Sequence, residues 1–221
     1  MRIAIMQPYF FPYLGYFRLM KVTDIFVILD NVQFQRRGWI HRNKFTKQGS
    51  DEDWLTLPVV KGKRDETQIR DLNFRKDLTM SDLVRPFKVN SNSRTVKELW
   101  PNFFSLDQNL LDYLEISMTR TAEILNLPTN FIRSSQVASK ADLKGEEYII
   151  HLCELLGAKM YVNAPGGKKL YSPQNFAHRG ISIKFLGDYK GSFTNCMERI
   201  LYEDTFSLQR EIVDNSQIEN K

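Results

Sequence analysis

The residues best suited to binding or group transfer gather in the first 45 positions of the chain. An apolar run over 3–6 ends at Gln7 and leads into a loop rich in tyrosine, phenylalanine and proline. A short helical segment and a second apolar run over 25–29 follow, ending at Asp30. Strand, loop, helix and strand form a βαβ unit, in which polar residues just past the strand ends face the usual ligand crevice. Gln7, Asp30 and Gln33 are therefore candidates for ligand contact, although Asp30 is equally suited to accept hydrogen bonds in a turn after its strand.

The segment over 33–45 is both polar and aromatic. Trp39, Arg42 and Asn43 combine a stacking surface, a planar cation and an amide, which are the groups that recognise sugars and phosphates. The alternative interpretation is a surface loop anchored by Trp39. The two interpretations have equal weight, because the segment follows a strand end on the expected ligand side of the sheet.

A glycine-rich segment follows a third apolar run, over 160–162. Gly166 and Gly167 free the backbone for a close approach to a ligand, while Lys168 and Lys169 add positive charge and Tyr171 follows. The GxxxxGK[ST] spacing of a Walker loop is absent. We therefore predict a ligand-contacting bend with a different chemistry.

The remaining pattern predicts a single α/β domain over 1–221 with a mostly parallel sheet and helices on both faces. We expect helices over 106–125, 144–156 and 173–178, two short helices within 78–100, and strands over 130–133 and 181–186. A β-hairpin is expected as an insertion, with strands over 54–60 and 68–74 and a turn over 61–65. The polar tail over 207–221 is expected to be poorly ordered.

Composition and charge narrow the partners. The net charge of +5 comes from basic residues scattered along the chain, with small clusters at 36–37, 61–64 and 168–169. This pattern favours an anionic small molecule, such as a sugar nucleotide, over a nucleic acid. No apolar stretch reaches the length of a membrane span, which predicts a cytoplasmic location. The two cysteines form neither a disulfide framework nor a zinc site, so no metal is predicted and the cofactor stays open.

Several stretches together resemble the WbqC-like proteins of bacterial surface polysaccharide (O-antigen) gene clusters. They are IAIMQPYFFPYLGYFRLM, FVILDNVQF, the Trp39-x-x-Arg42-Asn43 segment, WLTLPV, LKGEEYIIHLCELLGAKMYVNAPGGKKLY and FAHRGISIKF. The resemblance covers most of residues 1–187, whereas the C-terminal segment over 195–201 departs from the family pattern. It implies work on a nucleotide-linked sugar, with these site candidates: Gln7, Pro8, Tyr13, Gly15, Tyr16, Asp30, Gln33, Trp39, Arg42, Asn43, Gly166, Gly167 and Tyr171.

A fainter likeness concerns the turn Tyr13-Leu14-Gly15-Tyr16. Nucleotidylyltransferases and pantothenate synthetase-like ligases carry HxGH at this place, so the likeness implies a nucleotidylyltransferase-like (HUP/Rossmann-like) N-terminal unit. Tyrosines cannot carry the charge of an imidazolium, but Tyr13 and Tyr16 can hydrogen-bond a phosphate or carbonyl oxygen.

These observations lead to the hypothesis of an enzyme that N-acylates a nucleotide-linked amino sugar with an activated acyl donor. Asp30 or His41 would accept the amine proton. The expected oxygen donors are Tyr13, Tyr16 and Asn43, and the expected diphosphate ligands are Arg42, Lys168 and Lys169. The alternatives are an adenylate-forming amide ligase, a glycosyltransferase and a non-catalytic sugar-nucleotide-binding assembly factor. Glycosyl transfer would need an acidic metal-binding pair such as DxD near a strand end, and the acidic run over 51–53 lies in an expected polar loop.

Overall fold

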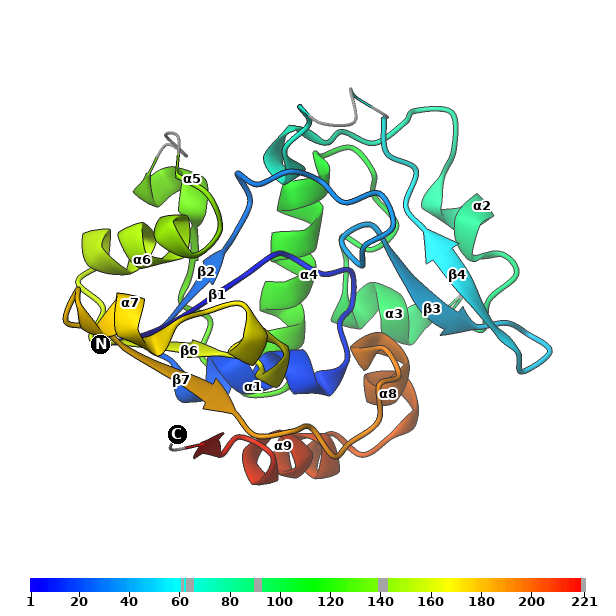
Figure 1. The fold of residues 1–221 in the computed structure, drawn as a ribbon. Helices are drawn as coiled ribbons and strands as arrows, with labels where there is room; N and C mark the ends of the chain where they lie inside the picture. Colours follow the sequence, from blue (N-terminus) through cyan, green and yellow to red (C-terminus); the bar gives the residue numbers. More distant parts are fainter. Residues whose placement is uncertain (61, 63–65, 90–92, 139–142, 220–221) are drawn as a thin grey trace.

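A six-stranded sheet forms the centre of the computed structural model, which describes residues 1–60, 62, 66–89, 93–138 and 143–219 (Figure 1). Its strands run in the order β5-β2-β1-β6-β7-β8, and all neighbours are parallel except β7 and β8. The bounds are β1 Arg2–Met6, β2 Ile25–Ile28, β5 Phe131–Arg133, β6 Met160–Asn163, β7 Ser182–Leu186 and β8 Ile218–Glu219. The predicted mostly parallel α/β architecture is confirmed.

Unbroken apolar runs form the central strands because both faces of the sheet are covered. Ala4 and Phe26 point to one hydrophobic core, whereas Ile3, Ile5 and Val27 point to a second. The helices α1 (Leu14–Val22), α4 (Leu110–Ile124) and α9 (Thr205–Asp214) contribute to the first core. The helices α6 (Gly145–Leu155) and α7 (Pro173–Ala177) contribute to the second core. The short helix α5 (Ser134–Val137) follows β5 directly and packs Val137 against the same core.

The strand order reverses between β1 and β6. From β1 the chain moves outward through β2 to β5, then returns to the other side of β1 and moves outward again through β6 and β7. Such a switch point opens a crevice at the carboxyl ends of the two central strands, and ligands of open α/β sheets bind there. Gln7 follows β1 and Asn163 ends β6, so both lie at this crevice.

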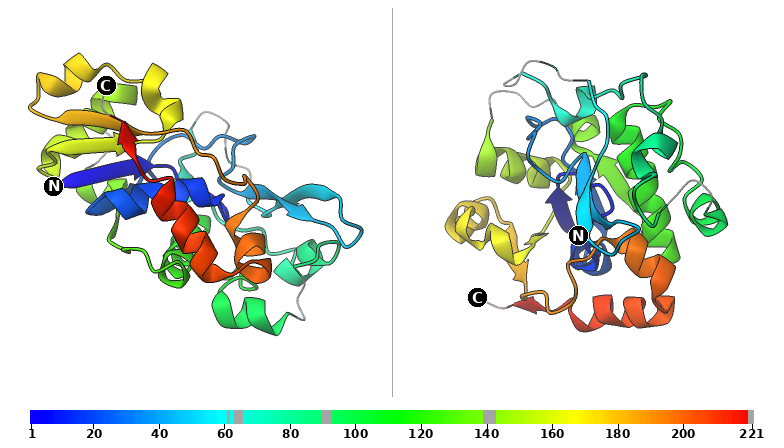
Figure 2. Two further views of the ribbon diagram at one scale, coloured as in Figure 1. Left: turned by 90° about the horizontal axis from the view of Figure 1, so that it is seen from below. Right: turned by 90° about the vertical axis from the view of Figure 1, so that its right-hand side faces the viewer.

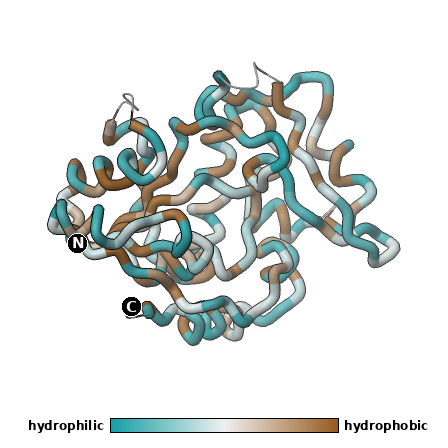
Figure 3. The backbone as a smooth tube through the Cα atoms, viewed as in Figure 1, coloured by the Kyte–Doolittle hydropathy of each residue, from teal (hydrophilic) through white to brown (hydrophobic). Residues whose placement is uncertain are grey.

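The inserted hairpin differs from the prediction in its pairing. Residues 52–56 form β4 (Glu52–Thr56), which pairs antiparallel with the preceding β3 (Arg42–Thr46). The expected partner over 68–74 instead holds the 3₁₀ turn η1 (Ile69–Asp71) and meets the other segment in one bridge, between Val59 and Phe74. Of the expected turn over 61–65, only Gly62 lies within the described residues. A short link between β3 and β4 closes the hairpin at lower entropic cost, and Figure 3 shows hydrophilic residues along it.

The helices α2 (Met80–Val84) and α3 (Arg94–Leu99) confirm the two short helices expected before α4. A side-chain cap starts each of the three, as Asn109 shows by accepting a hydrogen bond from the Asp112 amide at the start of α4. No helix of the described chain is long and apolar enough to cross a membrane.

The C-terminal tail forms a helix and a short strand over its described part. After α8 (Cys196–Tyr202), the helix α9 buries Leu208 and Ile212 and packs against α1, as Figure 2 shows, and β8 then pairs with β7. The buried Arg18 of α1 donates hydrogen bonds to the carbonyls of Gly187 (2.9 Å) and Asn215 (2.7 Å). Two buried apolar residues and these bonds therefore hold a segment that is otherwise polar.

Candidate functional site

A cavity of about 550 Å³ opens at the switch point between β1 and β6. It is lined by Leu29 and by residues from three segments that are distant in sequence, within 5–16, 35–40 and 163–171. The tyrosine-rich turn, the tryptophan segment and the diglycine bend thus meet around one hollow. Its polar and aromatic lining consists of Gln7, Tyr9, Tyr13, Tyr16, Gln35, Trp39, Asn163 and Tyr171.

The structure divides the predicted site residues into two groups. Eight line the cavity: Gln7, Pro8, Tyr13, Tyr16, Trp39, Gly166, Gly167 and Tyr171. Eight others do not: Gly15, Asp30, Gln33, His41, Arg42, Asn43, Lys168 and Lys169. Tyr9, Gln35 and Asn163 line it without having been predicted.

No described residue that lines the cavity carries a charged side chain. Burial raises the pKa of Tyr9, Tyr13 and Tyr171 above the ordinary value of a phenol, so these hydroxyls stay protonated at neutral pH. The side-chain amides of Gln7 and Gln35 make no hydrogen bond within the described part of the chain. The cavity therefore offers neutral hydrogen-bonding groups beside aromatic surfaces.

A row of aromatic rings leads outward from the cavity. The ring centroids are 5.9 Å apart between Tyr16 and Tyr9, 5.5 Å between Tyr9 and Trp39, and 5.0 Å between Trp39 and Trp54. The Arg42 guanidinium lies 4.2 Å from the Trp54 ring centroid and donates to the carbonyls of residues 37 (2.7 Å) and 38 (3.2 Å). Arg42 thus stiffens the wall of the cavity rather than lining it.

The diglycine bend forms the opposite wall, in the 3₁₀ turn η2 (Pro165–Lys169). The Asn163 Oδ1 atom accepts a hydrogen bond from the Ala164 amide (2.7 Å), which leaves its Nδ2 group without a partner among the described residues. A Cβ atom on Gly167 would stand 2.3 Å from that Nδ2, whereas one on Gly166 would meet nothing within 4 Å. The second glycine alone is therefore needed for close packing against Asn163.

The turn Tyr13-Leu14-Gly15-Tyr16 is explained in large part by packing. The Tyr16 hydroxyl donates to the Gln7 carbonyl (2.8 Å), and the Tyr13 ring packs against Tyr189 and Phe193. A Cβ on Gly15 would stand 2.2 Å from the Tyr13 ring. The nucleotidylyltransferase likeness stays a prediction.

Two predicted catalytic residues act as structural anchors. The buried Asp30 carboxylate accepts hydrogen bonds from the Ser134 hydroxyl (2.8 Å) and the Ser135 amide (2.9 Å), at the start of α5. Asn43 donates to the carbonyls of Phe10 (3.1 Å) and Phe11 (2.7 Å) and holds the loop in which Phe11 takes a left-handed conformation, with φ of 45°. Proton transfer by Asp30 and oxygen contact by Asn43 have no support in this placement.

His41 lies behind the cavity wall formed by Ile40. Its ring packs edge-on against Phe34, and its Nδ1 atom has no hydrogen-bond partner among the described residues. Burial, followed by the charge of Arg42, lowers the pKa of His41 to about 4. The imidazole is therefore neutral at physiological pH.

The lysines of the bend also lie outside the cavity lining. Lys168 forms an ion pair with Glu219 of β8, and Lys169 is exposed. Gln33 lines a separate hollow together with the residues of the following turn, 34–37. The positive charge expected at the diglycine bend is thus partly paired with Glu219.

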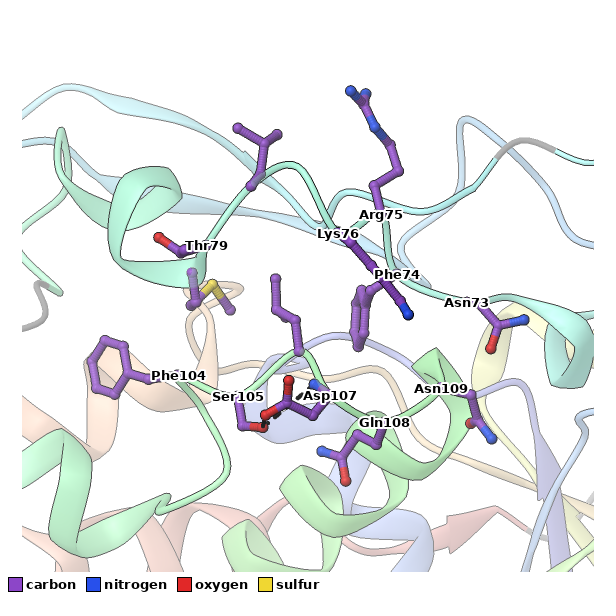
Figure 4. Close-up of a pocket in the computed structure, with 13 residues that line it drawn as sticks. Asn73, Phe74, Arg75, Lys76, Thr79, Phe104, Ser105, Asp107, Gln108 and Asn109 are labelled. Atoms are coloured by element: carbon purple, nitrogen blue, oxygen red, sulfur yellow. Dashed lines mark hydrogen bonds between the residues drawn. The ribbon is translucent and has the colours of Figure 1, made fainter.

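A larger hollow, of about 630 Å³, lies between the segments at 73–80 and 104–109 (Figure 4). Phe74 stands in its wall, and the Asp107 carboxylate accepts a hydrogen bond from the Ser105 hydroxyl (2.9 Å). None of the predicted site residues lines it, and it belongs to the insertion between β2 and β5. Size alone does not define a site, and the smaller cavity lies at the switch point of the sheet, where ligands of open α/β folds bind.

Fold and cavity together define an α/β protein with a ligand crevice at the switch point of its sheet. The chain belongs to the WbqC-like protein family, which it matches over residues 7–197. It is 30% identical over 215 residues to the uncharacterized protein Rv1507c of Mycobacterium tuberculosis, an alignment that covers 86% of this chain and 83% of that protein. No solved structure matches the chain.

Proposed function

We propose that this protein binds a nucleotide-linked amino sugar in the switch-point cavity and N-acylates its amine during surface polysaccharide biosynthesis. The membership of the WbqC-like family supports the polysaccharide context. The observation that carries the proposal is the uncharged cavity, in which carboxamides and phenols face an aromatic wall. A cytoplasmic location fits, since charged nucleotide sugars do not cross membranes unaided.

The lining matches the chemistry of a sugar ring. Trp39 offers a flat face on which the C–H bonds of a pyranose can stack, while Gln7, Gln35 and Asn163 offer amides to the hydroxyls. A cavity of about 550 Å³ lies within the range of small-molecule sites. Charged side chains are not required for such a ligand.

Acyl transfer would depend on orientation and on hydrogen bonds to the reacting oxygen. The neutral amine attacks the acyl carbon and forms the C–N bond, and the carbonyl oxygen takes up negative charge. When the carbonyl re-forms, the bond between the acyl carbon and the activating group breaks and that group leaves. The protonated hydroxyl of Tyr13 and the Nδ2 group of Asn163 are available to stabilise that oxygen. Since no carboxylate or imidazole of the described residues lines the cavity, the amine proton passes to water or to the leaving group.

Mass spectrometry tests the reaction directly. Purified protein is incubated with a nucleotide-linked amino sugar and a panel of acyl thioesters, and a mass gain equal to the acyl group is expected. Gly167→Ala should displace Asn163 and lower the rate at least about tenfold, the effect of a lost hydrogen bond in a site. Gly49→Ala is the control, because its Cβ also meets nothing within 4 Å and the residue does not line the cavity. Equal rates for the two variants would contradict the assignment of this cavity.

One alternative has an observation of its own. A cavity without a charged lining residue also suits a non-catalytic sugar-nucleotide-binding assembly factor, and binding without turnover on any donor would favour it. Glycosyl transfer has less support, because Glu52 and Asp53 lie in the hairpin and pair with Lys44 and Lys47. Adenylate formation rests only on the Tyr13-Leu14-Gly15-Tyr16 likeness.

A further inference from the structure

A second hollow lies at the turn over 35–38, near the cavity. It measures about 450 Å³, and the described residues that line it run consecutively from Gln33 to Arg37. Gln35 lines both this hollow and the cavity. The two spaces therefore share a wall residue and lie on either side of it.

The backbone of this turn is fixed by three hydrogen bonds. The Gly38 amide donates to the Gln35 carbonyl (2.9 Å), and Arg42 donates to the carbonyls of Arg37 (2.7 Å) and Gly38 (3.2 Å). The buried Phe34 anchors the turn at its start. Arg36 and Arg37 are thus presented from a constrained loop, although both side chains are exposed.

The two arginines keep donors available for a ligand. Arg36 uses one Nη2 contact, to the Gly62 carbonyl (2.9 Å), and the Arg37 guanidinium makes no hydrogen bond or ion pair to a described residue. A guanidinium presents its N–H groups as a planar fork that matches phosphate oxygens. The hollow is therefore equipped for an anion that the cavity itself does not attract.

We infer that the arginine hollow, Arg36 and Arg37 with the turn that carries them, holds the diphosphate of the nucleotide-linked sugar. This inference rests on the proposed function, because the diphosphate of such a molecule is joined directly to the sugar ring and must lie beside the sugar cavity. Of the cations first expected in this role, Arg42 is bonded to two carbonyls and Lys168 to Glu219. The arginine hollow takes their place.

Calorimetric titration with inorganic pyrophosphate, UDP and dTDP tests the hollow without any sugar. We expect the wild type to bind the nucleoside diphosphates, and the double variant Arg36→Gln/Arg37→Gln to bind them about tenfold to a hundredfold more weakly, as charge-assisted contacts are lost. The salt dependence of binding should fall as well. The double variant Arg85→Gln/Arg94→Gln, at positions whose side chains are 78% and 91% accessible, removes the same charge and is the control. Thermal unfolding of both double variants should match the wild type, because all four side chains are on the surface.

The outcomes separate this inference from the proposed function. Equal affinity of wild type and double variant for UDP and dTDP would overturn the arginine hollow, while the sugar proposal would stand if Gly167→Ala still impaired the full nucleotide sugar. Loss of UDP and dTDP binding in the double variant, with no contribution of the sugar to affinity, would keep the hollow and overturn the sugar cavity. Wild-type protein that binds none of the three probes at millimolar concentration would overturn the hollow outright.

Discussion

Replacement of Asp30 separates a structural anchor from a catalytic base. Its carboxylate accepts hydrogen bonds from the Ser134 hydroxyl (2.8 Å), the Ser135 amide (2.9 Å) and the Ser135 hydroxyl (2.5 Å). At a net value of about 1 kcal/mol for each bond, Asp30→Ala should lower the free energy of unfolding by about 3 kcal/mol. For a chain of this length that is a fall of about 6–12 °C in the melting temperature. Asp30→Asn keeps the shape and one acceptor oxygen, so its cost should be about 1–2 kcal/mol.

Urea unfolding followed by circular dichroism measures these values, with Asp71→Ala as the control because that side chain is 57% exposed. The acylation assay with a nucleotide-linked amino sugar, run well below the melting temperature, completes the experiment. An Asp30→Ala protein as stable as the wild type but without turnover would refute the anchor and restore Asp30 as a candidate base.

Three further perturbations follow from the same geometry. The pKa of His41 is lowered from 6.5 to about 4 in the folded protein. As the pH falls, the imidazole is therefore protonated in the unfolded chain before it is protonated in the folded one. The free energy of unfolding should reach its full value above pH 6.5 and should be about 2 kcal/mol lower at pH 5. Urea unfolding at the two pH values measures this loss, and His41→Phe should abolish it. Gly15→Ala should push the Tyr13 ring aside and cost about 1–3 kcal/mol, whereas Gly49→Ala, which meets nothing within 4 Å, should not. Arg42→Ala removes two bonds to carbonyls and should cost about 2 kcal/mol, seen also as a shift in tryptophan fluorescence; unchanged stability and emission would argue against the stiffening role.

The elements that the sequence predicts well are those with long or unbroken apolar patterns. The strands β1 and β2 and the helix α4 are examples, because covered strands and amphipathic helices leave a clear periodicity. The strand β3 alternates buried Asn43 and Phe45 with charged residues and therefore resembles a polar loop. In α9 only Leu208 and Ile212 are fully buried, which is too weak a signal against ten mostly polar residues.

The candidate site was predictable in its location but only partly in its membership. The glycine bend and Trp39 follow strand ends and could be found from topology. Asn163 could have been found by the same rule, since it ends β6. Asp30 satisfies that rule too, yet its carboxylate turns to the α5 amide. A strand end shows where a side chain begins, and only the packing of a distant helix decides which way it points.

The closing strand β8 has a practical consequence for anyone shortening or tagging the chain. It pairs with the last two residues of β7, Phe185 and Leu186, whose outer edge would otherwise present unpaired backbone groups to other molecules, and its Glu219 forms an ion pair with Lys168 in the glycine bend. Removal of residues 215–221 would leave this part of the β7 edge free to pair with another molecule. It would also remove the ion pair between Glu219 and Lys168 that holds the bend. A purification handle is therefore expected to disturb this protein more at its C-terminal end than an equally small insertion in the exposed turn around Gly49.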